Sequence, residues 1–113
     1  MSFLGEKKEA VPSILVVDDE ETVIYTLQAV LKREGYVIHS ARSAKEAINI
    51  LETASFDLII SDVNMPGASG LDLLDNVKAK DPDCLVILIT AYGSEAIAVD
   101  AMKRGAYDYL PKP

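Results

Sequence analysis

The chain has 113 residues, which is room for one domain, and half of them are apolar, which is enough for a single small core. The net charge of -7 argues against direct binding of nucleic acid, because contact with a phosphate backbone requires a basic surface. One cysteine, Cys84, excludes an intramolecular disulfide and fits a reducing, cytoplasmic compartment. No apolar run approaches the ~20 residues of a membrane-spanning helix, so we expect no membrane partner.

Two regions differ in pattern along the chain. Residues 1–11 are short, mixed in charge and without hydrophobic period, and we expect them to form a flexible leader. From residue 12 to residue 113 the pattern switches repeatedly between continuous apolar runs and helical spacing. Continuous apolar runs of about five residues are typical of strands that are buried on both faces. We therefore expect one domain over residues 12–113.

The first half of this domain predicts two strands and two helices. An apolar run at 13–17 predicts the first strand, and helical spacing over 21–34 predicts the first helix. A second strand is predicted at 36–38. Ser43, with Glu46 three residues later, has the spacing of a capping box and predicts the start of the second helix.

The second half repeats the alternation. Strands are predicted at 57–61, 84–90 and 107–110. A third helix is predicted between the first two of these strands, and a fourth, capped by Ser94, between the last two. Alternation of this kind indicates an α/β fold with a doubly wound, five-stranded parallel sheet and helices on both faces, because each crossover is right-handed.

The end of the sequence carries a further expectation. An open sheet of this kind usually has a helix after its last strand, but this sequence stops three residues after Leu110. We expect that part of one sheet face is left uncovered by these elements, which would cost burial of apolar surface. A second copy in a homodimer, an exchanged element or a continuation of the chain would cover it.

Polar residues follow the predicted strands where each of them ends. Asp18 and Asp19 follow the first strand, Asp62 the third, Thr90 the fourth and Lys112 the fifth. In an open parallel sheet these ends meet at one edge, where ligands bind. Three carboxylates that crowd together need a counterion, and oxygen ligands favour Mg²⁺, with Mn²⁺ as a second candidate.

The same set could carry phosphoryl chemistry. An aspartate carboxylate can accept a phosphoryl group, and a hydroxyl and an ammonium can bind its oxygens. Each residue alone also has an ordinary structural interpretation. Asp18 and Asp19 could cap a helix, Asp62 could stabilise a turn, Thr90 could be a strand residue and Lys112 a solvated lysine. Their combination at the strand ends favours the functional interpretation.

Four motifs together resemble a known family. They are the segments 14–20 (ILVVDDE), 62–67 (DVNMPG), 90–91 (TA) and 105–113 (GAYDYLPKP). The chain is similar to the response-regulator receiver domain, the CheY-like phosphoacceptor module of two-component signalling. This resemblance implies a flavodoxin-like fold with the strand order 2-1-3-4-5. The final segment is also similar to receivers of NtrC-type regulators.

The resemblance also implies roles for individual residues. Asp62 would accept a phosphoryl group from the phosphohistidine of a histidine kinase. Asp19, Asp62 and the main-chain carbonyl of Asn64 would bind Mg²⁺ directly, with Asp18 assisting. 

The same resemblance assigns the phosphoryl contacts and the switch. Thr90 and Lys112 would bind the phosphoryl group, and Tyr109 would be the switch aromatic whose ring moves inward when Thr90 is drawn to that group. The domain would then control an output domain or a downstream protein, which is DNA-binding or an ATPase in many members. It would catalyse at most its own phosphorylation and dephosphorylation.

Three other functions compete with this interpretation. A Mg²⁺-dependent phosphohydrolase could also use an aspartyl-phosphate, but such enzymes commonly have a second acid where this chain has Asn64. A nucleotide- or flavin-binding domain would need a glycine-rich phosphate loop, and neither common pattern is present. A degenerate receiver would lack site residues, whereas all five are here. The only histidine, His39, is expected to be an ordinary strand residue.

Overall fold

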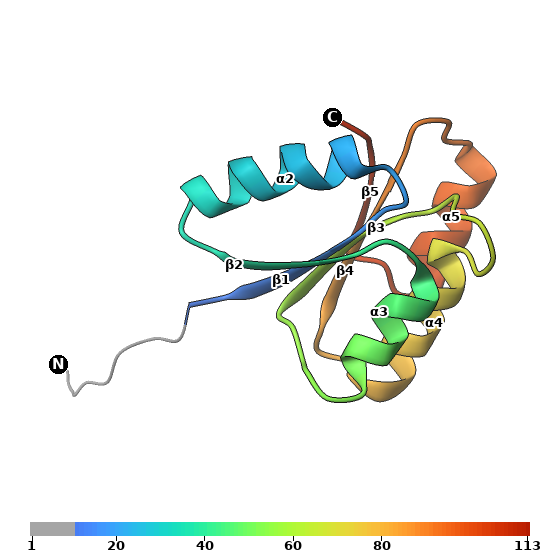
Figure 1. Cartoon of the computed structure of the whole chain (residues 1–113). Coiled ribbons are helices and arrows are strands. Elements are labelled where there is room, and N and C mark those ends of the chain that lie inside the picture. Colours follow the sequence, from blue (N-terminus) through green and yellow to red (C-terminus); the bar gives the residue numbers. More distant parts are fainter. Residues whose placement is uncertain (1–10) are drawn as a thin grey trace, which may run out of the picture.

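The computed structural model describes residues 11–113, and the predicted leader lies almost entirely outside them (Figure 1). Five strands alternate with four helices in this part of the chain. In chain order they are β1 (Ser13–Val17), α2 (Glu21–Arg33), β2 (Val37–Ala41), α3 (Ala44–Leu51), β3 (Leu58–Asp62), α4 (Gly70–Lys80), β4 (Leu85–Thr90), α5 (Glu95–Lys103) and β5 (Asp108–Pro111).

All strand pairs are parallel, and the strand order is β2-β1-β3-β4-β5. This confirms the predicted fold and order. The chain first moves outward from β1 to β2 and then returns to β3 on the other side of β1. The order therefore reverses between β1 and β3, which is the place where open α/β sheets bind ligands.

The register brings the strand ends to one edge. Val17 pairs with Ser61, Asp62 with Ile89, and Thr90 with Pro111. Because each pair lies at the carboxyl end of both strands, the residues that follow β1, β3, β4 and β5 emerge side by side.

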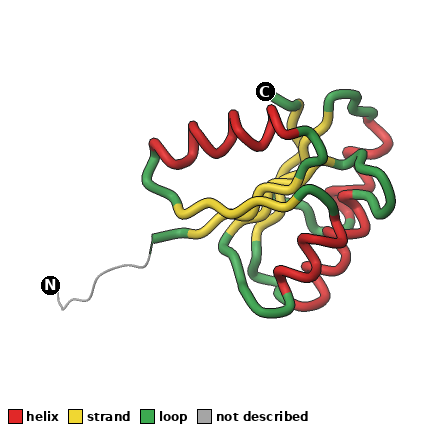
Figure 2. Tube along the Cα trace, viewed as in Figure 1, coloured by secondary structure: helices red, strands yellow, loops and turns green. Residues whose placement is uncertain are grey.

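The helices form two unequal layers. Helix α2 lies alone on one side of the sheet, and α3, α4 and α5 lie on the other (Figures 1 and 2). Successive side chains of β1 point to opposite faces of the sheet. Leu15 and Val17 belong to the larger core, under α3, α4 and α5, and Ile14 and Val16 belong to the smaller core, under α2. Burial on both faces explains why the central strands read as continuous apolar runs.

The α2 side is covered less completely than the other. Ile87 is only half-buried, and Leu85 and Leu110 are each 42% exposed. Within residues 11–113 no helix follows β5. The incomplete cover agrees with the sequence-based expectation, and what covers this face in the protein stays a prediction.

Most predicted boundaries lie within one residue of the observed ones, but the extent of β2 and one cap contact differ from the predictions. Strand β2 runs over Val37–Ala41 rather than 36–38, because it is an edge strand whose polar residues do not read as buried strand. The Ser43 hydroxyl caps α3 by accepting a hydrogen bond from the main-chain amide of Glu46, as predicted. The Glu46 carboxylate, however, accepts from the main-chain amide of Arg42 rather than from that of Ser43. 

A reciprocal capping box lies instead at the start of α4. The Ser69 side chain accepts from the Asp72 amide, and the Asp72 carboxylate accepts from the Ser69 amide. This box fixes the end of the loop that leads away from β3. Among the described residues, no helix has both the length and the apolar character needed to cross a membrane.

Candidate phosphoacceptor site

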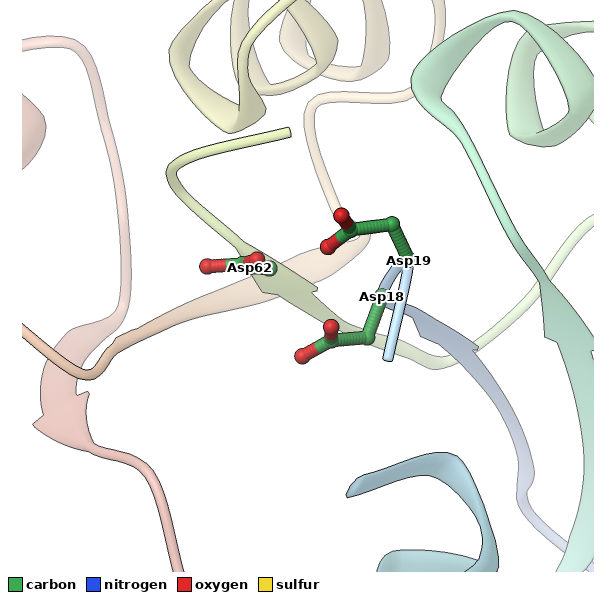
Figure 3. Close-up of side chains that lie close together, drawn as sticks. All are labelled: Asp18, Asp19 and Asp62. Carbon is green, nitrogen blue, oxygen red and sulfur yellow. The ribbon is translucent and has the colours of Figure 1, made fainter. Parts of the chain in front are cut away.

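Three aspartates meet at the carboxyl ends of β1 and β3 (Figure 3). Asp18 and Asp19 follow β1, and Asp62 is the last residue of β3. One carboxylate oxygen from each lies within 4.8 Å of the others. Asp18 and Asp62 are buried, whereas Asp19 is partly exposed. The structure thus brings together the three acids that the sequence argument expected to meet.

The donor set fits a hard divalent cation. Oxygens are the ligands that Mg²⁺ prefers, and three close carboxylates repel one another unless a cation compensates them. Asp18 Oδ2 is buried and accepts no hydrogen bond within residues 11–113, although Lys112 Nζ lies at an ion-pair distance of 3.1 Å. A buried carboxylate oxygen without a hydrogen bond is costly, and a cation would satisfy it.

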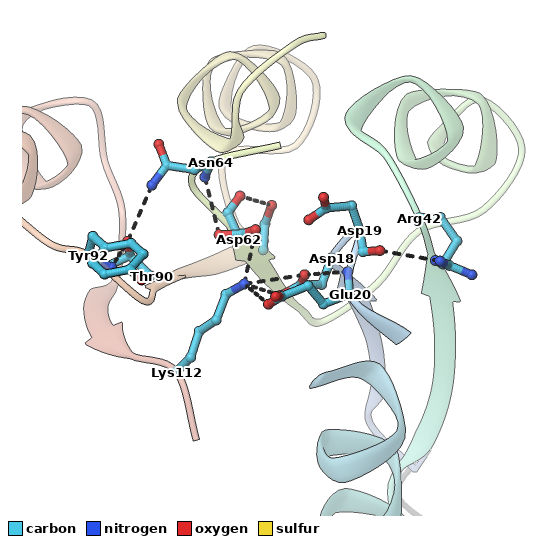
Figure 4. Close-up of polar contacts among 10 residues, drawn as sticks. Asp18, Asp19, Glu20, Arg42, Asp62, Asn64, Thr90, Tyr92 and Lys112 are labelled. Carbon is cyan, nitrogen blue, oxygen red and sulfur yellow. Dashed lines mark hydrogen bonds and ion pairs between the residues drawn. The ribbon is translucent and has the colours of Figure 1, made fainter. Parts of the chain in front are cut away.

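Lys112 reaches the acidic cluster from the end of β5 (Figure 4). Its Nζ lies 3.2 Å from Asp62 Oδ2, 3.1 Å from Asp18 Oδ2 and 2.7 Å from Glu20 Oε1. The Lys112 main-chain amide donates to Thr90 O at 3.0 Å, which extends the β4–β5 pairing by one residue. Lys112 therefore joins the site through the sheet itself. The contact with Glu20 was not predicted from the sequence.

Thr90 is buried at the end of β4, next to Asp62 in the sheet order. Its Oγ1 accepts a hydrogen bond from the Tyr92 amide at 3.1 Å and lies 3.5 Å from Asn64 Nδ2. The main-chain amide of Asn64 donates a hydrogen bond to Asp62 Oδ1 at 3.2 Å. The loop after β3 therefore contacts both Asp62 and the end of β4.

A cavity of about 180 Å³ opens among these side chains, lined by Asp19, Glu20, Asp62, Asn64, Ala91, Tyr92 and Lys112. It contains carboxylates, an ammonium and main-chain loops in one small space. Larger hollows beside α2 and between α3 and α4 have no such cluster of acids. Charge rather than size therefore distinguishes this cavity.

Burial dominates the protonation of the site. It raises the pKa of Asp18 and of Asp62, and the hydrogen bonds from Lys112 offset this only in part. Burial also lowers the pKa of Lys112, but hydrogen bonds to Glu20, Asp18 and Asp62 outweigh it and raise this pKa above its ordinary value. The lysine is therefore charged at neutral pH, and the two buried carboxylates share that single cation.

Gly70 was missed in the sequence analysis although it positions Asp62. A Cβ at Gly70 would lie 2.2 Å from Asp62 O, so no side chain fits there. The Gly70 amide donates to Val63 O at 2.9 Å, which holds the first turn of α4 against the end of β3. A glycine directly after the Ser69 cap was the available signal for such a close approach.

The predicted switch residues are neighbours. Tyr109 packs against the larger core, and its buried hydroxyl has no hydrogen-bond partner among the described residues. A Cβ at Gly93 would lie 3.1 Å from both the Tyr109 hydroxyl and Thr90 Cγ2. Thr90 and Tyr109 therefore flank the same glycine. His39 lies apart in β2 and packs edge-on against Phe56, as an ordinary strand residue.

The sequence matches the family described as the response regulator receiver domain over residues 14–113. Among curated proteins, it is 42% identical over 99 residues to the response regulator protein PilR of Pseudomonas aeruginosa. The match covers 88% of this chain but 22% of PilR. The chain thus spans about a fifth of the length of this relative.

Solved structures agree with this assignment. The NtrC4 receiver domain, solved as a beryllofluoride-activated dimer, is 42% identical with a TM-score of 0.84, covering 89% of this chain and 84% of that one. A response regulator from Burkholderia pseudomallei, solved with a phosphorylated aspartic acid, a calcium ion and citrate, is 36% identical with a TM-score of 0.85. There the match covers 90% of this chain and 60% of the other.

These matches give no support to the phosphohydrolase alternative. They agree with the five-stranded parallel sheet and its strand order. The chain belongs to the response regulator receiver family and is a receiver domain of two-component signalling.

Proposed function

We propose that Asp62 is the phosphoacceptor of this receiver and takes its phosphoryl group from the phosphohistidine of a histidine kinase. The observation that carries the proposal is the position of the Asp62 carboxylate. It is buried, lies 3.2 Å from Lys112 Nζ and stands in an acidic cluster that fits a divalent cation. A phosphorylated aspartic acid in a relative of 36% identity supports it.

The transfer itself is a single exchange of bonds at phosphorus. One Asp62 carboxylate oxygen forms a bond to phosphorus while the bond from phosphorus to the donor histidine breaks, and the imidazole nitrogen keeps the electron pair. Lys112 and Thr90 bind oxygens of the transferred group. Their part is to place the group and to balance its charge rather than to move protons.

Mg²⁺ is the proposed cofactor, with Mn²⁺ as a second candidate. Asp19, Asp62 and the main-chain carbonyl of Asn64 would hold the ion directly, and Asp18 would assist. When bound, the ion supplies two positive charges beside the phosphoryl oxygens. The three close carboxylates, the buried Asp18 oxygen that accepts no hydrogen bond within residues 11–113, and the calcium ion in the related structure support a cation at this place.

The conformational response would pass through Thr90 and Tyr109. The phosphorylated Asp62 side chain would carry about -1.5 to -2 charge in place of the single charge of the carboxylate, and new acceptor oxygens, to which the Thr90 hydroxyl would turn. Space vacated near Gly93 would then favour the inward position of the Tyr109 ring. The shared contact of both side chains with Gly93 supports this coupling.

The wider setting is proposed from the relatives. The chain spans 22% of PilR, so we expect it to act together with an output domain or downstream protein, which is DNA-binding or an ATPase. We expect the same domain boundary, residues 12–113, and a cytoplasmic location. The dimer of the related NtrC4 receiver supports homodimerisation, with the incompletely covered face or an exchanged element as alternatives for the contact.

Phosphorylation by a small donor tests the assignment. The protein is incubated with acetyl phosphate, with and without Mg²⁺, and the modified residue is identified by mass spectrometry after borohydride trapping. We expect modification of Asp62 that requires Mg²⁺ and is lost in Asp62→Asn. Asp83→Asn, the same change on an exposed turn, is the control and should be modified normally. Full modification of Asp62→Asn, or an unmodified wild type, would refute the proposal.

A further inference from the structure

Lys112 makes its shortest contact with a residue that has no part in the proposed chemistry. Glu20 Oε1 lies 2.7 Å from Lys112 Nζ, compared with 3.1 Å for Asp18 Oδ2 and 3.2 Å for Asp62 Oδ2. Glu20 is the N-cap residue of α2, yet its side chain makes no capping hydrogen bond. Within residues 11–113, its carboxylate hydrogen bonds to Lys112 instead.

The number of protons on the ammonium makes this contact significant. A lysine ammonium has three protons, and three carboxylates surround this one. A phosphoryl oxygen that arrives at Asp62 therefore finds each of these protons facing a carboxylate. One contact has to break before Lys112 can bind the new group.

Exposure decides which contact breaks most easily. The side chain of Glu20 is 57% exposed, whereas those of Asp18 and Asp62 are 0% and 3% exposed. Water can replace the lysine at an exposed carboxylate at little cost, but not at a buried one. Glu20 is thus the partner that Lys112 gives up.

We propose that Glu20 is a positioning residue that competes with the incoming phosphoryl group for Lys112 and thereby slows the phosphorylation of Asp62. The inference rests on the proposed function of Asp62. Glu20 also lines the cavity over Asp62, so its negative charge meets the donor on entry. The delay is therefore larger for a donor of higher negative charge, and Glu20 favours less charged donors.

Rate measurements with matched variants test the inference. Glu20→Gln removes the charge and keeps the length of the side chain. Glu21→Gln makes the same change in the next residue, which is 83% exposed and contacts Arg42 at 3.6 Å rather than Lys112. We expect Glu20→Gln to accelerate phosphorylation by acetyl phosphate about threefold to tenfold. Phosphorylation by phosphoramidate, which is less charged, should be accelerated by a smaller factor. Glu21→Gln should stay within about twofold of wild type.

Two further measurements separate competition for Lys112 from a general charge effect. In a Lys112→Gln background, most of the acceleration by Glu20→Gln should be lost, because the competition for Lys112 is gone and only the repulsion between Glu20 and the donor remains. In the Mg²⁺-free protein, nuclear magnetic resonance of the Lys112 ammonium should show faster hydrogen exchange with water in Glu20→Gln and no change in Glu21→Gln. This second readout does not depend on phosphorylation.

The outcomes distinguish this inference from the proposed function. If the wild type is phosphorylated on Asp62 but Glu20→Gln is equally fast or slower, Glu20 does not compete and the inference is wrong. An equal gain in Glu21→Gln, or an undiminished gain in the Lys112→Gln background, would also overturn it. If the wild type is not phosphorylated on Asp62 at all, the proposed function itself fails.

Discussion

Gly70 approaches the main chain of Asp62 too closely for any other residue type. A Cβ at this position would lie 2.2 Å from Asp62 O and 3.0 Å from the Cα of Val63. Both neighbours are backbone atoms, so relief would require a shift of α4 away from the end of β3. Such a shift would move the Asp62 carboxylate relative to Asp18 and Lys112.

Gly70→Ala is therefore expected to damage stability and the site together. We expect a loss of about 1–3 kcal/mol in the free energy of unfolding, as for overpacking in a core, and weaker Mg²⁺ binding. Urea unfolding and calorimetric titration with Mg²⁺ measure the two effects. Gly35→Ala is the control: its φ of 95° makes alanine unfavourable, but nothing lies within 4 Å of the added Cβ. It should lose stability and keep its Mg²⁺ affinity, whereas unchanged Mg²⁺ affinity in Gly70→Ala would contradict the prediction.

At the scale of an element, the loop between β4 and α5 controls the space around Tyr109. Gly93 in this loop faces the Tyr109 hydroxyl and Thr90 Cγ2, each 3.1 Å from where a Cβ would lie. The buried hydroxyl of Tyr109 makes no hydrogen bond to the described residues. Packing against the core and against Gly93, rather than a hydrogen bond, therefore holds the ring in its observed position.

Gly93→Ala is expected to push the Tyr109 ring outward. The added methyl group would be too close to the hydroxyl and to the ring edge, 3.3 Å from Cε2. Ring resonances of Tyr109 in nuclear magnetic resonance spectra, recorded with and without beryllofluoride and Mg²⁺, would report the change. In a Tyr109→Phe background the effect should shrink, because the nearest atom is absent. Spectra of Gly93→Ala that match those of wild type would rule out this steric role.

The elements also show how far the sequence can be interpreted. Strands β1, β3 and β4 are buried on both faces and were predicted almost to the residue, whereas the edge strand β2 was predicted too short. The strand order came from the family resemblance, because a hydrophobic period does not encode which strands pair. 

The site divides in the same way. Asp18, Asp19, Asp62, Thr90 and Lys112 could be chosen because parallel strands bring their ends to one edge. Glu20 and Gly70 were missed, since their contacts depend on side-chain reach and backbone distance. Glu20 and Lys112, for example, are separated by 92 positions in the sequence. The binding and switching roles of the predicted residues stay predictions.

For the whole molecule, the acidic cluster links stability to pH. Burial raises the pKa of Asp18 and Asp62, so the folded protein without Mg²⁺ holds their protons more tightly than the unfolded chain does. Their contribution therefore becomes unfavourable as pH rises from the ordinary value of 3.8 through the raised values. The raised pKa of Lys112 acts at the other end: its stabilisation is complete below the ordinary 10.5 and is lost only as pH rises through the raised value.

Mg²⁺ should therefore stabilise the protein more at pH 7.5 than at pH 5. Bound cation removes the repulsion among ionised carboxylates, and a concentration of 100 times its Kd adds about 2.7 kcal/mol. Differential scanning calorimetry at both pH values measures the shift in Tm. Without Mg²⁺, Asp62→Asn should have a higher Tm than wild type, because relieved repulsion adds about 1–3 kcal/mol to the free energy of unfolding. Its Tm should respond little to the ion. Equal responses to Mg²⁺ at the two pH values would contradict this account.

The hydrogen bond from the Lys112 amide to Thr90 O has a consequence for the diversity of such domains. It sets the spacing between the main chains of Thr90 and Lys112 through the pairing of β4 with β5. Substitutions in the loops after β3 and β4 are therefore expected to leave this main-chain spacing unchanged, so receivers can differ in these loops while the two strand ends keep their relative position.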